Sequence, residues 1–515
     1  MSAASQETLG QVWGALRKLG GGNGYPPELM KAINQATGLV WYDLEPYAKL
    51  LFPVITPLRN EIPRVKGDGG TAAHWISITG ININNVNISL GEGQRGGSVT
   101  TQVVQNLATY KSFGLDDSVT FEADLAAENF DDAKRLAVDN LLRATMIGEE
   151  KRIIGGNTDL PLGLTPSPTL SDVSTGGSLP FNTQFSVIAV GLSYDGFVND
   201  SVAGGVLAQV TRTNTDGSSI TYGGGSAQKS ANVLITTAND AVNTHSIRAV
   251  LPQTGNQQSQ PGAVAWAWFW GPSGAEVLGA ITTVNSLLIT ANATGTQLAS
   301  SLPAADNSTD AYAFDGLITM IETVANGAQI YAMPAPTGSA IGIGTTLTPD
   351  GAGGIVEIDA ILKAFWDVSR LGPQVMLVNS QELKNITNKV IAGGGTPLFR
   401  FLIDNGGVMS ASQLEASGGT IVGSYMNKYT MAGGQLLKVL LHPNIPPGTI
   451  IFYSRQLPYP LSNVRNLLQM KMRRDYFQIE WPIVRPAYEF SVWANGVLQV
   501  FFNPAFGTIC NIGNG

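Results

Sequence analysis

The sequence has almost none of the residues that usually carry catalysis or bind metals. Its 515 residues include one cysteine, Cys510, and three histidines, His74, His245 and His442. One cysteine excludes an internal disulfide, and histidines this far apart do not form a Cys/His zinc motif. The sequence also lacks a GxxxxGK[ST] phosphate-binding loop and a GxSxG nucleophile motif. We therefore expect no enzyme activity, no cofactor and no metal.

Charge is scarce as well. Charged residues make up 13% of the chain, and 30 basic against 38 acidic residues give a net charge of −8. This balance argues against a dedicated nucleic-acid-binding protein, because phosphate contacts need clustered positive charge. Interface centres are depleted in charge, so the composition favours a surface that partners cover. The alternative is a glycine-rich β protein, with 60 glycines, whose surface is unusually neutral.

Long hydrophobic runs are missing too. The longest are short segments such as AVAWAWFW, well below the roughly 18 residues that span a membrane. The start, MSAASQETLGQVWGALRKLGGG, has no basic region followed by an apolar run, so it does not resemble a secretory signal. We expect a soluble chain, made in a reducing compartment, with no membrane partner.

Residues 67–120 predict two long strands, because HWISITGININNVNISL and SVTTQVVQNLATYKSF both alternate apolar and polar residues. The tip between them, GEGQRGG, matches the GxGxxG spacing of a dinucleotide-binding loop. That motif needs a helix after it, and SVTTQVV is strand-like, so we interpret Gly91–Gly96 as a loop tip. A free two-stranded ribbon is only marginally stable, so this one is expected to lie on another molecule.

Residues 130–157 predict one long helix with a continuous apolar face and ion pairs on its flanks. Gly155 and Gly156 are expected to end it. The side chains predicted to pack on this face are Phe130, Ala133, Ala137, Leu141, Ala144 and Ile147.

Residues 172–309 are nearly uncharged and rich in turn signals between β-like runs, which predicts an inserted β-sandwich of the immunoglobulin-like kind. Its Trp266, Trp268 and Trp270 fall on one face of a strand. Such a row either packs the core of the sandwich, which we favour, or binds a glycan.

Mixed structure follows this block. AYAFDGLITMIETVANG and VEIDAILKAFWDVSRLGP predict helices, PQVMLVNS a buried strand, and SQELKNITNKVIAGGG a helix capped by Asn379 and reciprocally by Glu382. The C-terminal 80 residues predict strands, with Asn495-Gly496 as the type I′ turn of a terminal hairpin.

Two charge clusters have more than one interpretation. The acidic one could hold a cation, but a solvated turn before a helix is favoured; it comprises Asp116, Asp117, Glu122 and Asp124. A basic one could touch nucleic acid, but ion pairing within a sheet or across a subunit boundary is favoured. The residues predicted to make inter-subunit charge contacts are Arg64, Lys66, Lys471, Arg473 and Arg474.

The order of these elements resembles the major capsid protein of tailed bacteriophages, the Hong Kong 97-type fold. Three stretches carry the resemblance: TPLRNEIPRVKGDGGTAAHWISITGIN; NFDDAKRLAVDNLLRATMIGEEKRIIGGN followed by LPLGLTP; and AFDGLITMIETV with GAGGIVEIDAILKAFWDVSR and PQVMLVNSQELKNI. The flanks rejoin this pattern when residues 172–309 are removed.

The resemblance implies an α+β chain in six parts. These are an N-terminal arm (1–60), an extended β loop (61–120), a spine helix that starts a peripheral domain (121–171), the inserted β-sandwich (172–309), an axial α/β domain (310–435), and peripheral-domain strands with the C-terminal hairpin (436–515).

The resemblance also implies a function. The chain would self-assemble as pentamers and hexamers into an icosahedral virion shell, made in the host cytoplasm, that encloses double-stranded DNA without sequence-specific binding. The arm is too short to include a scaffolding segment, so we expect a separate scaffolding protein, a portal and a decoration protein as partners. Lys66 and Lys111 flank the loop, but no asparagine partner for an isopeptide bond can be matched. The alternatives are an encapsulin-like nanocompartment shell and a glycan-binding surface or fibre protein.

Overall fold

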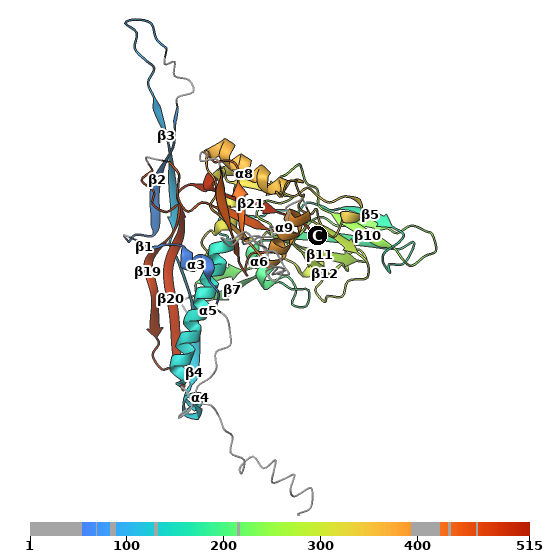
Figure 1. Cartoon of the computed structure of the whole chain (residues 1–515). Coiled ribbons are helices and arrows are strands. Elements are labelled where there is room, and N and C mark those ends of the chain that lie inside the picture. Colours follow the sequence, from blue (N-terminus) through green and yellow to red (C-terminus); the bar gives the residue numbers. More distant parts are fainter. Residues whose placement is uncertain are drawn as a thin grey trace, which may run out of the picture. The chain divides into compact units, whose positions relative to one another are not determined.

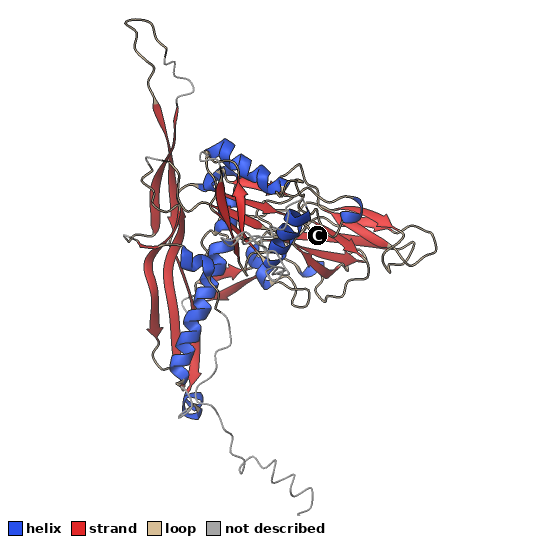
Figure 2. Cartoon of the chain, in the orientation of Figure 1, coloured by secondary structure: helices blue, strands red, loops and turns tan. Residues whose placement is uncertain are grey.

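The fold is known from a computed structural model of the whole chain. It describes residues 54–67, 69–82, 89–127, 132–213, 217–392, 423–430, 434–459 and 462–514. Strands are the main element and helices are few, so the prediction of a mixed α+β chain is confirmed (Figure 2). Most of the predicted arm, and Phe130, lie outside the described residues.

The chain divides into two compact units. The described part of the first includes α4 (Phe121–Ala126) and the first turn of α5 (Ala133–Gly155). Thr120 caps α4 by accepting a hydrogen bond from the Ala123 N–H at 3.2 Å. An ion pair of 2.9 Å joins Lys134 to Asp124. The second unit comprises 53–119 and 137–515 and includes all other described elements, together with β4 (Lys111–Thr120) up to Val119 and α5 from Ala137.

A four-stranded sheet with the order β1-β19-β20-β4 lies beside α5 (Figure 1). Its strands are β1 (Arg64–Lys66), β19 (Leu468–Glu480), β20 (Ala487–Val500) and β4 (Lys111–Thr120). The short helix α3 (Pro57–Glu61) precedes β1, which pairs with β19 in parallel. Buried apolar residues of β19 and β20 pack in the same core as Ile153 and Ile154 of α5, so one face of the long helix covers the sheet.

The predicted terminal hairpin at Asn495-Gly496 is wrong. Both residues lie inside β20, which pairs antiparallel with β19 and shows an irregular register at this point. The turn that joins β19 to β20 lies within 481–486 instead. A Cβ on Gly496 would lie 2.5 Å from Sδ of Met472, so glycine is there for close approach between strands and not for a turn.

The predicted ribbon is formed by β2 (Ala72–Asn82) and β3 (Thr100–Thr109), which pair antiparallel with a bulge between Ile78 and Gly80. The second predicted strand is divided at Tyr110, because β4 begins at Lys111 and belongs to the other sheet. Gly91–Gly96 forms an exposed connection without a helix after it, so the loop-tip interpretation is confirmed.

Residues 169–289 contain two sheets that share a core. One has the order β13-β10-β5 and the other β12-β11-β6-β9. The strands are β5 (Thr169–Val173), β6 (Gln184–Leu192), β9 (Val233–Thr236), β10 (Ser246–Val250), β11 (Ala265–Gly271), β12 (Val277–Thr282) and β13 (Ser286–Ile289). A separate hairpin, β7 (Gln209–Thr213) with β8 (Ser219–Gly223), and the short helix α6 (Tyr194–Asn199) accompany them. We call this region the two-sheet module.

All three tryptophans of β11 lie in the core between these two sheets, at 0–7% exposure. The Nε1–H of Trp268 donates to Oγ1 of Thr282 at 2.8 Å, and that of Trp270 to the Ala291 carbonyl at 2.9 Å. Core packing is therefore confirmed for this row, and a glycan-binding row is wrong.

A six-stranded sheet with the order β14-β21-β18-β15-β17-β16 forms the other large layer. Its strands are β14 (Gln329–Ala332), β15 (Val375–Val378), β16 (Ser424–Asn427), β17 (Gln435–Leu441), β18 (Ile450–Tyr453) and β21 (Phe506–Cys510). The helices α8 (Val356–Ser369) and α9 (Ser380–Ala392) contribute to the core on one face. The short α7 (Leu317–Glu322) and the end of α5 pack on the other.

Two helix predictions need correction. The helix expected over 311–327 is shorter, because only Leu317–Glu322 is α-helical and a 3-10 turn, Val324–Asn326, follows it. Asn379 does cap α9, since its Oδ1 accepts from the Glu382 N–H at 2.9 Å. Glu382 does not return the bond to Asn379; its carboxylate accepts instead from the Gly448 N–H at 3.0 Å.

Three short 3-10 helices complete the described elements, at Ala299–Ser301, Gly338–Ala340 and Asn503–Ala505. In the described part of the chain, no helix is both long and apolar enough to cross a membrane.

Candidate assembly surfaces

The ribbon β2–β3 presents a row of exposed apolar side chains. The register pairs Ile78 with Val103 and His74 with Leu107, so these residues share one face with Ile76. Exposed fractions on this face are 67% for Ile76, 71% for Ile78, 52% for Val103 and 61% for Leu107. Isolated exposed apolar residues need no explanation, but a continuous face of them marks a contact surface.

The base of the ribbon is fixed to the rest of the fold. Trp75 packs edge-on against Phe501, with ring centroids 6.2 Å apart, and Ser77 Oγ donates to the Phe501 carbonyl at 3.2 Å. Beyond this point the described side chains of β3 from Thr100 to Gln105 are all exposed. The ribbon is thus held at one end and uncovered at the other (Figure 1).

The segment that leads to the ribbon is anchored to α5 by two adjacent, fully buried carboxylates. Glu149 accepts from Nε of Arg59 at 2.9 Å and from Nη1 of Arg64 at 2.8 Å. Tyr476 of β19 also donates its hydroxyl to Glu149. Burial, followed by the Glu149 charge, raises the pKa of Tyr476, so this phenol stays a donor.

Glu150 binds a different set of groups. Its Oε1 accepts from the Leu58 N–H at 2.9 Å and its Oε2 from the Arg59 N–H at 2.6 Å. Nε2 of His442 lies 2.6 Å from Oε1, and the Asn444 N–H donates to Nδ1 of the same ring at 3.2 Å. Because Nδ1 accepts, the proton of a neutral His442 is on Nε2 and points at Glu150. We call Glu149, Glu150 and their partners the arm anchor.

The predicted packing face of the long helix is only partly the buried one. Leu141 is buried at 6% exposure, while Ala133, Ala137 and Ile147 are partly exposed and Ala144 is exposed. The buried residues of α5 are instead Leu141, Thr145, Glu149, Glu150, Ile153, Ile154 and Gly155. The sequence interpretation missed the arm anchor because it assigned the charged residues of this helix to the solvent side. The available signal was the spacing of Glu149, which follows the buried Leu141 and Thr145 at intervals of four residues.

The helix α5 ends where it was predicted to end, but for a different reason. The helix stops at Gly155, as expected, but neither Gly155 nor Gly156 has a positive φ. A Cβ on Gly155 would meet the ring of Tyr194 at 2.2 Å, and one on Gly156 would meet the Phe314 carbonyl at 2.2 Å. Both glycines therefore allow close packing of other segments on the helix end.

The five predicted charge-contact residues have different surroundings. Arg64 is used within the chain, because its Nη2 lies 2.7 Å from Asp475 in addition to the bonds to Glu149. Burial opposes ionisation of Asp475, but the hydrogen bond from Arg64 holds its pKa below the usual value. Arg474 stacks on Phe477, 3.6 Å from the ring centroid. Lys66 and Arg473 are exposed and Lys471 is half-buried, so these three stay candidates for contacts between subunits.

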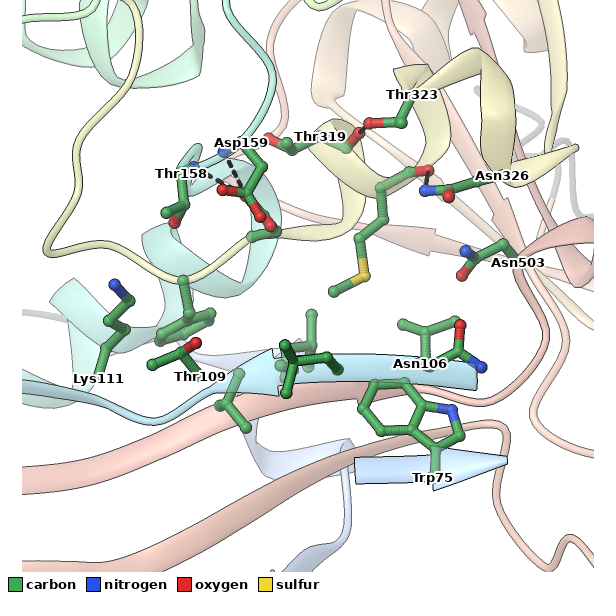
Figure 3. Close-up of a pocket in the computed structure, with 18 residues that line it drawn as sticks. Trp75, Asn106, Thr109, Lys111, Thr158, Asp159, Thr319, Thr323, Asn326 and Asn503 are labelled. Atoms are coloured by element: carbon green, nitrogen blue, oxygen red, sulfur yellow. Dashed lines mark hydrogen bonds between the residues drawn. The ribbon is translucent and has the colours of Figure 1, made fainter. Parts of the chain in front are cut away.

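A cleft of about 390 Å³ opens between the ribbon base and the segment after α5. Figure 3 shows Thr158 and Asp159 on one side of it and Trp75 and Asn106 on the other. Asp315 accepts from the Thr158 N–H at 2.8 Å; burial and the neighbouring Asp159 raise its pKa against that bond. The cleft has no histidine or cysteine in its lining, and no group of three or more His, Cys, Asp or Glu in the described ranges is placed to hold a metal.

No protein-family model matches the chain, and no curated protein matches it. Solved structures match over nearly its whole length. The cyanophage A-1(L) capsid is 12% identical, with 92% of this chain and 98% of that chain covered and a TM-score of 0.40. The capsid of Myoviridae phage XM1 is 10% identical, with coverages of 93% and 98% and a TM-score of 0.38. The SrpI encapsulin of Synechococcus elongatus PCC 7942 is 8% identical, with coverages of 91% and 93% and a TM-score of 0.34. The chain is similar to these two phage capsids and to this encapsulin.

Proposed function

We propose that the chain is the repeating subunit of a closed protein shell, namely the major capsid protein of a tailed bacteriophage. The observation that carries the proposal is the ribbon β2–β3. Four apolar side chains on one of its faces are more than half exposed, although burying each would stabilise the chain by about 1.5–3 kcal/mol. A second copy that covers this face supplies that burial, and repetition of such a head-to-tail contact closes into rings.

The arrangement of the elements supports a Hong Kong 97-type subunit. In this proposal α5 is the spine helix, the ribbon is the extended loop, and the sheet β1-β19-β20-β4 is the peripheral domain. The six-stranded sheet with α8 and α9 is the axial domain. The arm anchor then fixes the N-terminal arm to the spine helix at the point where the arm enters the extended loop.

The two-sheet module is, in the same proposal, an insertion into this subunit. The segments that enter and leave it lie side by side. The Asp310 N–H donates to the Asn157 carbonyl and the Gly316 N–H to the Gly156 carbonyl, both at 2.8 Å, and Asp306 accepts from the Gly163 N–H at 2.7 Å. Arg152 of α5 pairs with Asp195 at 2.8 Å and with Asp310 at 3.3 Å, which ties the module to the spine helix.

Assembly tests the main proposal. The purified chain, expressed alone and with a co-encoded scaffolding protein, should form closed particles with fivefold and sixfold units in electron micrographs. Ile78→Asp should prevent particles while leaving a folded chain, because it places a charge in the proposed contact. Val210→Asp is the matched control: Val210 is 53% exposed on the separate hairpin β7–β8, so this variant should still assemble. Assembly of both variants would refute the ribbon contact, and a chain that stays monomeric in all conditions would refute the shell.

Removal of the module tests the insertion. A short glycine linker from Gly163 to Asp306 deletes 164–305. The two residues lie close together, because the Gly163 N–H donates to the Asp306 carboxylate. Particles should still form, with a lower thermal stability because Asn511, which follows β21, loses the hydrogen bond that its Oδ1 accepts from the Asn285 N–H. If the shortened chain folds but forms no particles, the module contributes to the contacts that build the shell.

The contents of the particles separate the two kinds of shell. Packaged double-stranded DNA would support the phage capsid and its partners, a portal, a scaffolding protein and a decoration protein. A co-purifying enzyme and no DNA would support an encapsulin-like compartment instead. The third alternative, a glycan-binding protein, loses the support of the tryptophan row, because that row is buried.

A further inference from the structure

A small cavity of about 10 Å³ lies where the two-sheet module meets the six-stranded sheet. Trp266 of β11 reaches it from the module, Glu322 from the end of α7 and Cys510 from β21. The complete lining is Gln258, Ala263, Val264, Trp266, Thr283, Ile318, Glu322, Thr449, Thr508, Cys510 and Asn511. None of the proposed shell contacts uses this cavity, so what it holds is independent of the proposed function.

Three polar atoms that belong to this lining have no hydrogen-bond partner among the described residues. They are Oε2 of Glu322, Oε1 of Gln258 and Nε1 of Trp266, all buried. Other polar groups there are satisfied: Thr508 Oγ1 donates to the Ile450 carbonyl, and the Asn511 side chain bonds both Asn285 and Met333. Buried polar atoms usually have partners, so three unsatisfied ones around one cavity indicate a bound ligand.

The chemistry of these atoms specifies the ligand. Trp266 Nε1–H can only donate, and Gln258 Oε1 can only accept. Glu322 is 2% exposed, and Nε2 of Gln258 already donates to its Oε1 at 3.0 Å. Burial raises the pKa of Glu322 to about 8, and the nearby Gly262 N–H lowers it by a smaller amount. That N–H does not form a hydrogen bond with Oε2. The carboxyl is therefore protonated near pH 7, and its second oxygen is a donor.

Two donors and one acceptor around a space the size of one small molecule fit water. A water molecule accepts two hydrogen bonds and donates two, and a cavity of roughly 10–15 Å³ with two to four polar partners is what a buried water needs. We propose that this cavity binds one water molecule through Trp266, Gln258 and protonated Glu322, and that ionisation of Glu322 opens the junction between the two-sheet module and the six-stranded sheet.

The junction opens on ionisation because nothing in the cavity compensates the charge. Its lining includes no lysine, arginine or histidine. The other titratable group is the Cys510 thiol, whose pKa burial and then the Glu322 charge raise, so it stays neutral. An ionised Glu322 would also lose the proton that it donates to the water, and a buried unpaired carboxylate is strongly unfavourable.

Alkylation of Cys510 measures the opening, because this is the chain's one cysteine and it is buried. Iodoacetamide is added to the full-length protein between pH 6 and 7.5, and modification is followed by mass spectrometry. The thiolate fraction rises about tenfold per pH unit below the ordinary thiol pKa of about 8.5. If opening releases the Glu322 proton, the opening constant rises by a further tenfold or so per unit. The wild-type rate should thus rise about a hundredfold per unit, and that of Glu322→Gln only about tenfold.

Two variants keep the test sharp. Asp200→Asn removes a half-buried carboxyl of the module, whose pKa desolvation raises to about 7, so it should keep the wild-type slope if only the junction opens. A smaller increase of the labelling rate with pH in this variant would show that the whole module unfolds. That result would refute opening at the junction alone. Trp266→Phe removes one donor to the water and should speed labelling about equally at every pH; an unchanged rate would overturn the water site.

A direct observation completes the test. A cryo-electron microscopy map that resolves ordered water should show a density peak in hydrogen-bond contact with Glu322, Gln258 and Trp266. Equal slopes for the wild-type protein and Glu322→Gln, or side chains that close the space without a peak, would refute the proposal.

Discussion

The substitution Glu150→Gln tests whether the arm anchor holds the entry segment on the long helix. Glu150 accepts two backbone N–H groups, from Leu58 and Arg59, and the Nε2–H of His442. A glutamine of the same shape keeps one acceptor oxygen and replaces the other with an NH₂ group. That NH₂ would face the Arg59 N–H, donor against donor, so one bond is lost and one buried donor loses its partner.

The size of the effect follows from these contacts. A hydrogen bond to a charged group contributes about 1.5–3 kcal/mol, and an unsatisfied buried donor costs about 1–3 kcal/mol. Glutamine recovers part of this because it removes a buried charge, so we expect a net loss of roughly 3 kcal/mol for local opening of the segment. At about 1.4 kcal/mol per factor of ten, the Leu58 and Arg59 amides should exchange hydrogen about a hundredfold faster.

Hydrogen exchange measured by mass spectrometry on peptides covering 54–62 provides the assay. Glu357→Gln is the matched control, because Glu357 is also buried and its Oε2 accepts a backbone N–H, that of Thr348, at 2.9 Å. It should speed exchange at Thr348 and leave Leu58 and Arg59 unchanged. If Glu150→Gln changes exchange at Leu58 and Arg59 less than about threefold, the anchor does not hold this segment.

Three further predictions concern other parts of the chain. Leu141→Asp should cost at least the roughly 2–5 kcal/mol of a buried Leu→Ala change and abolish soluble folded protein, whereas Ala144→Asp on the exposed side of the same helix should be tolerated; circular dichroism after purification compares them. His245 lies between Asp172 and Asp240, 3.0 and 2.8 Å away, and its pKa is raised above 6.5 by the hydrogen bond to Asp240, so its stabilisation of β10 should be full below pH 6.5 and be lost as the pH rises through the raised value. The hydrogen-exchange rate of the β10 amides should therefore increase over this pH range in the wild-type protein and change less in His245→Gln. An equal increase in both proteins would refute the stabilising role of His245. Particle yield should change little between low and high salt, because the proposed ribbon contact is apolar, and a steep decline with salt would point to Lys66, Lys471 and Arg473 instead.

Much of the fold could be predicted from periodicity alone. The alternation in 72–109 predicts the ribbon, and the three-and-four spacing after Ala133 predicts the long helix, because each pattern reflects one local geometry. The turn predicted at Asn495-Gly496 was wrong because this dipeptide occurs both in turns and where two strands approach closely. The residue that distinguishes the two cases, Met472, is on another strand. The shortness of α7 depends on tertiary contacts, since Gly316 is packed against the backbone of Arg152 and Gly155.

The arm anchor shows why charge was hardest to place. A sequence with 13% charged residues invites the assumption that each charge is on the surface, yet Glu149, Glu150 and Arg64 join segments about 90 residues apart. Burying a carboxylate is unfavourable unless several donors meet it. Here the donors come from α3, β1, β19 and His442, which no local pattern brings together. The same property makes the anchor specific, since a shifted segment would remove the Arg59 and Arg64 bonds from Glu149 and both backbone N–H bonds from Glu150. Charge in this chain therefore fixes how its own segments meet, and the exposed ribbon, which is nearly free of charge, is free for the contacts that we propose with other copies.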